Sequence, residues 1–200
     1  APVTVQKPLT LLTNTGTLTL SAPWNLNTNP ITASIANGTL NWTGPLNNAG
    51  NLTKTGNGTL ALANASFAPG AVLTVSGGLL QLHADVGTTL PPSASLQNSS
   101  QLGFLSSQHL AALQMDAGSA TTLNAGASAT LSLASLSLAG VPGAWTSRLD
   151  LTNGSAIISS DPSHLSAALS LPAPNLPKAA TAVPGTPSPA SPPPSPMNPP

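Results

Sequence analysis

A short phrase of alternating apolar and polar residues recurs along the first 160 residues. It consists of a glycine, a threonine or leucine, a leucine, any residue and a further apolar residue. Its four clear copies span residues 16–20, 38–42, 58–62 and 78–82, and their glycines are 22, 20 and 20 residues apart. Alternation with a period of two predicts half-buried β-strands. A fixed spacing of about 20 residues predicts a fold built from stacked repeats.

Turn-forming residues separate the phrases, as in Asn37-Gly38, the Gly-Asn-Gly of 56–58 and the Ser-Gly-Gly of 76–78. A coil of short strands that turns once and stacks on the previous coil satisfies both patterns. The sequence therefore predicts an all-β, right-handed parallel β-helix (solenoid) of about seven coils, with about 20–22 residues in each. The alternative fold is a β-sandwich with strands of similar length.

Equivalent residues of successive coils should form columns in this solenoid. We expect apolar side chains to stack inside and turn glycines to form the corners. The inward set is Leu18, Leu20, Leu40, Leu60, Leu62, Leu80 and Leu82, and the corner set is Gly38, Gly58 and Gly78. Asn37 and Asn57 occupy equivalent turns, where their side chains can hydrogen-bond from coil to coil.

Three regions follow from the pattern: a β-helical repeat domain over 1–160, a short capping helix over 161–171 and a proline-rich tail over 172–200. Asp161 and Pro162 suit a helix start. Twelve of the 22 prolines lie in the tail, which we expect to be a disordered linker. Residues 106–115 are ambiguous, because propensity alone would also permit a short helix there.

Charge is scarce: 4% of residues are charged, the net charge is zero, and cysteine is absent. This excludes the clustered basic residues that nucleic-acid binding requires. The absence of cysteine excludes disulfides and thiolate metal sites. The longest charge-free stretch, 117–147, is interrupted throughout by polar residues, glycine and proline, so no membrane span is expected in this segment.

One segment resembles a known family. Residues 50–62 read GNLTKTGNGTLAL, which closely resembles the autotransporter-associated β-strand repeat of bacterial surface proteins, with a core of about LTKxGxGTLxL. Residues 72–82 (VLTVSGGLLQL) fit the strand that follows in that family. Residues 106–158 look like the C-terminal module that often follows such repeats. The resemblance implies a bacterial, extracellular or cell-surface β-helical passenger or stalk without catalytic residues.

Candidate chemistry is sparse. His83 and Asp85 are two residues apart and can be interpreted as a metal corner, as a base with its orienting carboxylate, or as solvent-facing residues at a strand end. A metal site needs at least three ligands, and no third is recognisable nearby. The four aspartates are 31, 34 and 11 residues apart, so they should not stack, and there is no glutamate to act as a general acid. We therefore expect no catalytic, cofactor-binding or metal-binding residues.

Tryptophans are the remaining candidates for ligand contact. Trp42 occupies the inward position of its repeat, which predicts a core residue. Trp145 lies in a turn beside Pro142 and Gly143 and is the candidate ligand contact, because an exposed indole can stack on a sugar ring. The alternative is that Trp145 closes the last coil.

These observations predict a non-catalytic, extracellular structural or adhesive β-solenoid segment of a bacterial surface or secreted protein. Its expected partners are a surface polysaccharide or a host or matrix surface. The main alternative is a carbohydrate-binding or carbohydrate-processing β-helix. A further alternative is a segment that assists its own export by folding progressively outside the cell.

Overall fold

The structure, a computed structural model, describes residues 1–87, 90–126, 128–141 and 143–159. These residues form strands and connecting loops, and none of them is helical. The segment 106–115, for which a helix was one expectation, contains the eight-residue strand β15 (Gln108–Met115). The capping helix expected over 161–171 and the proline-rich tail over 172–200 lie outside the described residues.

Three parallel sheets and one hairpin make up the fold. Sheet A contains β1 (Val3–Thr4), β4 (Trp24–Asn25), β7 (Leu46–Ala49) and β10 (Ala65–Phe67). Sheet B contains β2 (Leu9–Thr13), β5 (Ile31–Ile35), β8 (Leu52–Thr55), β11 (Val72–Ser76), β13 (Ser93–Leu96), β15, β17 (Thr130–Leu138) and β21 (Ser155–Ile158). Sheet C contains β3 (Thr17–Leu20), β6 (Thr39–Trp42), β9 (Thr59–Leu62), β12 (Leu79–Leu82), β14 (Gln101–Phe104), β16 (Ala120–Leu123) and β20 (Arg148–Asp150).

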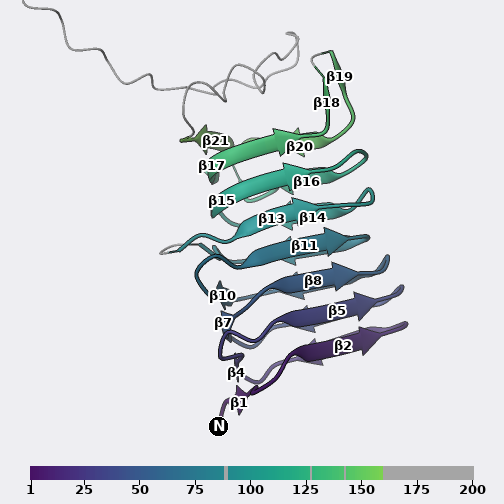
Figure 1. The fold of residues 1–200 in the computed structure, drawn as a ribbon, viewed down its shortest axis with the longest axis vertical. Coiled ribbons are helices and arrows are strands. Elements are labelled where there is room, and N and C mark those ends of the chain that lie inside the picture. The colour runs from purple at the N-terminus through teal and green to yellow at the C-terminus, as the bar shows by residue number, and fades with distance from the viewer. Residues whose placement is uncertain (88–89, 127, 142, 160–200) are drawn as a thin grey trace, which may run out of the picture.

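In the first four coils the chain visits the three sheets in rotation, and afterwards it alternates between sheets B and C. Each circuit lies directly on the circuit before it (Figure 1). Sheet C has seven strands, one for each coil. All pairings within the three sheets are parallel, as a solenoid requires and a β-sandwich does not. The parallel β-solenoid is confirmed.

The predicted inward columns form in the predicted register. Leu18, Leu40, Leu60, Leu80 and Leu102 are successive partners in sheet C, and a second column contains Leu20, Trp42, Leu62, Leu82 and Phe104. From the second coil onward these side chains are buried in one continuous core. Leu18 stays 39% exposed because β3 is the edge strand of its sheet and no described coil lies below it.

The corner glycines are required by close packing between coils. A Cβ on Gly58 would overlap the carbonyl oxygen of Gly38 and a methyl group of Ile35, and a Cβ on Gly78 would overlap the carbonyl oxygen of Gly58. The carbonyl of Gly38 accepts a hydrogen bond from the Thr59 amide of the next coil (2.9 Å). The corner role predicted for these glycines is therefore confirmed.

The asparagine ladder expected at the same corner does not form. Asn37 and Asn57 are exposed, and within the described residues their side chains make no hydrogen bond. Their backbone amides provide the inter-coil contacts instead: Asn57 donates to the carbonyl of Ala36 (3.0 Å), and Asn37 donates to that of Asn14 (3.0 Å).

The regular cross-section changes after the fourth coil. Sheet A ends at β10, and the longer strands β15 and β17 provide more of the later coils. In sheet C the partners Thr121 and Leu149 are 28 residues apart in the sequence. This separation is long because the hairpin of β18 (Gly140–Val141) and β19 (Ala144–Trp145) is inserted before β20. In Figure 1 this hairpin extends beyond the last coil along the solenoid axis.

Replacing Leu60 by aspartate tests the inward assignment. Leu60 is 1% exposed between Leu40 and Leu80, so a carboxylate there would be buried without a partner. We expect Leu60→Asp to lower the free energy of unfolding by about 4 kcal/mol or more. The control is Ala61→Asp, which adds the same charge to the outward face of the same strand. Equal denaturant midpoints for the two variants would contradict the assignment.

Candidate functional site

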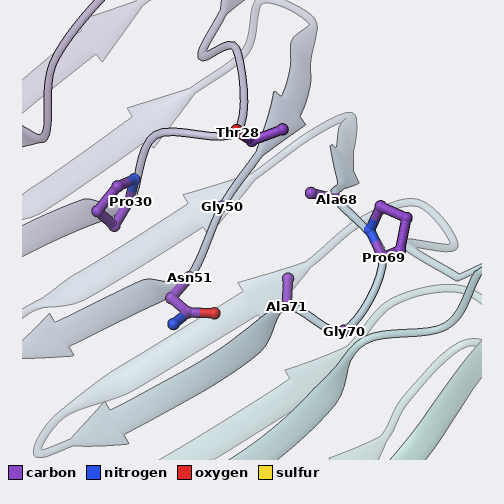
Figure 2. Close-up of a pocket in the computed structure, with 8 residues that line it drawn as sticks. All are labelled: Thr28, Pro30, Gly50, Asn51, Ala68, Pro69, Gly70 and Ala71. Atoms are coloured by element: carbon purple, nitrogen blue, oxygen red, sulfur yellow. The ribbon is translucent and has the colours of Figure 1, made fainter.

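The surface is hollowed where loops of three successive coils meet beside sheets A and B. This corner groove has a volume of about 410 Å³ and is lined by Thr28 and Pro30, by Gly50 and Asn51, and by the turn 68–71. Figure 2 shows the rings of Pro30 and Pro69 on opposite sides of the backbone at Gly50. A Cβ at position 50 would overlap the carbonyl oxygen of Thr28, so glycine at this position allows the two coils to touch.

The chemistry of the corner groove is neutral. Its lining contains proline rings, alanine methyl groups, one hydroxyl and one amide, with no charged or aromatic side chain among the described residues. The Oδ1 of Asn51 accepts a hydrogen bond from the Val72 amide (3.0 Å), which holds the side chain across two coils. Such a lining can contact a small neutral group, but it contains no general acid or base that would activate the Thr28 hydroxyl.

Among the described residues, His83 and Asp85 share no hydrogen bond or ion pair. The strand β12 ends at Leu82, and His83 is exposed just beyond it. Asp85 instead contacts His109 on the next coil, with 2.5 Å between Oδ2 and Nδ1. The Oδ1 of Asp85 accepts hydrogen bonds from the backbone amides of Gly87 (3.0 Å) and His109 (3.1 Å).

The Asp85–His109 pair has the geometry of a carboxylate that orients an imidazole. The His109 side chain is 53% exposed, so its second ring nitrogen lies near the surface. In the described part of the chain, neither partner belongs to a group of three or more histidine, cysteine or acidic side chains, the number that a metal site needs. Two of the three contacts of Asp85 reach His109, so Asp85 ties the loop 83–87 to β15.

Trp145 lies in β19 and pairs with Gly140 across the antiparallel hairpin. Its side chain is half-buried and is not among the described side chains that pack against the core. Its role as a ligand contact stays a prediction. Trp42 is buried as expected and packs edge-on against Trp24, with ring centroids 5.3 Å apart.

The residue that sequence reasoning missed is Lys54. It is completely buried, in the inward column of sheet B between Ala33 and Val75. Its Nζ donates hydrogen bonds to the carbonyl oxygens of Gly56 (2.7 Å) and Gly77 (2.8 Å), with a longer contact to Thr55 (3.4 Å). Burial lowers the pKa of Lys54 from 10.5 to about 8. The signal was present in the sequence, because Lys54 has the same parity as the inward Leu52.

None of the described residues forms a helix that is long and apolar enough to cross a membrane. Comparisons of the chain with protein-family models, with curated proteins and with solved structures each find no match.

The buried lysine predicts a specific dependence of stability on pH. The unfolded chain keeps the Lys54 proton up to about pH 10.5, whereas the folded chain releases it near pH 8. Between these values the unfolded state binds more protons, so the free energy of unfolding should rise with pH, by on the order of 3 kcal/mol in total. The chain has no tyrosine or cysteine to titrate in this window.

Urea unfolding at pH 7.5, 8.5, 9.5 and 10.5 measures this effect. The control is Lys54→Met, which keeps a similar volume and removes the titrating group, so its free energy of unfolding should vary much less across the window. Parallel curves for the native chain and this variant would show that Lys54 is not the source.

Proposed function

We propose that this chain is an extracellular, non-catalytic solenoid of a bacterial surface or secreted protein, which acts as a rigid spacer and as an adhesive surface. The observation that carries the proposal is the unbroken inner column, which joins seven coils into one continuous core. In such a stack each coil is stabilised by its neighbours, which favours length and stiffness over a localised site.

The resemblance of 50–62 to the autotransporter-associated repeat supports an extracellular location. In this chain the segment contains β8, the glycine corner and β9, so the resembling residues coincide with one repeating unit of the solenoid. The near absence of charge and the lack of cysteine are compatible with a surface stalk whose core supplies the stability that disulfides would otherwise give.

The outward face of sheet B supports an adhesive role. Thr10, Thr32, Thr53, Thr74 and Ser95 are successive partners there, which places one hydroxyl on each of the first five coils. Within the described residues, the hydroxyls of Thr32, Thr53 and Thr74 make no hydrogen bond. Apart from His109, the only titratable side chain of the described sheet B strands is Lys54, which points inward. This face suits neutral, hydroxyl-rich surfaces such as polysaccharides.

Labelling of intact cells tests the location. Antibodies raised against the folded chain should label unpermeabilised cells of the source organism, and external protease should remove the label. Labelling that requires permeabilised cells would contradict the proposal.

Replacing threonine by valine on the outward face tests adhesion, because valine keeps the shape and removes the hydroxyl. We expect Thr32→Val, Thr53→Val and Thr74→Val together to weaken binding to immobilised neutral polysaccharides at least fivefold, since each lost hydrogen bond contributes about 1 kcal/mol. The control is Thr39→Val with Thr59→Val on sheet C. Binding that is unchanged by the triple variant but abolished by Trp145→Ala would favour the alternative of a carbohydrate site at the hairpin.

A further inference from the structure

The alternating pattern of the strands leaves one ambiguity in how the coils align. Sliding a strand by one residue would turn its apolar side chains to the solvent, so the pattern forbids it. Sliding by two residues preserves the pattern. In the fourth coil Ala71, Leu73 and Val75 are all buried. After a slide of two residues, each position opposite the third coil would hold the next of these apolar side chains. Apolar packing alone therefore distinguishes these alignments weakly.

Lys54 is the exception within the inward column. Its neighbours along that column are Leu11, Ala33, Val75, Leu96, Met115 and Leu138, all of them apolar. Ala33 is the smallest of these, so it leaves room beside the long lysine side chain. From Ile31 to Leu82, Lys54 is also the only charged or titratable residue, so no carboxylate from any neighbouring strand faces it.

The two closest carbonyl partners of Lys54 belong to different coils, and both accept a hydrogen bond from its ammonium group. Gly56 forms the corner of the third coil, and Gly77 forms the corner of the fourth, both with left-handed backbone angles. Among the described residues, no turn or loop amide donates a hydrogen bond to either carbonyl, whereas the carbonyls of Ile35 and Ala36 at the preceding corner accept from Gly58 and Asn57. At the junction of the third and fourth coils, the carbonyl oxygens of Gly56 and Gly77 are therefore available to accept hydrogen bonds from an ammonium group.

We infer that Lys54 sets the alignment of the third and fourth coils, because its ammonium group bridges the carbonyls of Gly56 and Gly77 only when β8 and β11 are in their native register. A slide of two residues would move the Gly77 carbonyl about 7 Å along the strand. The ammonium group would then be buried with one of its acceptors lost, which is strongly unfavourable. A buried polar group that specifies register at some cost in stability is known from coiled coils.

Cysteine pairs measure the alignment directly, because the chain contains no cysteine of its own. Thr53→Cys with Thr74→Cys joins partners of the native register, and Thr53→Cys with Ser76→Cys joins residues that face each other only after a slide of two. With Lys54 present, we expect a short thiol crosslinker to react with the first pair at least tenfold faster than with the second. In Lys54→Met this ratio should fall to within about threefold.

The matched control is Leu52→Met, which changes an inward residue of the same strand and keeps the lysine. It should leave the ratio of crosslinking rates unchanged. A ratio that stays tenfold or higher in Lys54→Met would overturn the inference, because the register would then hold without the lysine. An equal fall of the ratio in Leu52→Met would also overturn it, because the effect would then belong to apolar packing.

A measurement on the unmodified chain keeps the inference testable if Lys54→Met fails to fold. The chain has three lysines, Lys7, Lys54 and Lys178, so the NMR signals of their side-chain nitrogens are few. At pH 6 the Lys54 nitrogen should show hydrogen-bond couplings to the carbonyl carbons of Gly56 and Gly77, with slowly exchanging protons. A Lys54 signal that exchanges as fast as that of a free lysine would overturn the inference.

Discussion

Backbone hydrogen bonds between successive coils determine the distance between equivalent residues, which is about 4.8 Å in a parallel sheet. At that distance every position in a coil must tolerate its counterpart directly above and below. The glycine corner shows this constraint most clearly, since the carbonyl of Gly38 occupies the space where a Cβ on Gly58 would lie and also accepts the Thr59 amide of the next coil. The recurring glycine-leucine phrase is a consequence of this geometry.

The same stacking explains why charge is so scarce. A charged side chain repeated in every coil would meet its like at about 4.8 Å, inside or outside the solenoid, and repulsion would oppose the stack. Lys54 is tolerated because it occurs once and because two glycine carbonyls surround its ammonium group. The outer face can then present neutral hydroxyls on successive coils, which links the architecture to the adhesive role that we propose.

Much of the fold could be predicted from the sequence because it repeats, and the parts that do not repeat could not. The spacing of Leu40, Leu60 and Leu80 predicts their column, and period two also places Lys54 inside, although its charge argues against that position. The contact between Asp85 and His109 joins residues 24 apart through a loop without a counterpart in other coils. The corner groove depends on how three loops meet, which no single motif encodes.

Distances between pairs of spin labels on the outward column of sheet B test whether the coils stack in sequence order. One label at Thr10 would be paired with a second at Ser95, Gln114 or Ser137, which lie four, five and six partners along the column. Coils stacked in sequence order should give separations of about 19, 24 and 29 Å, increasing by one coil spacing at each step. Separations that do not increase in this order would contradict a solenoid.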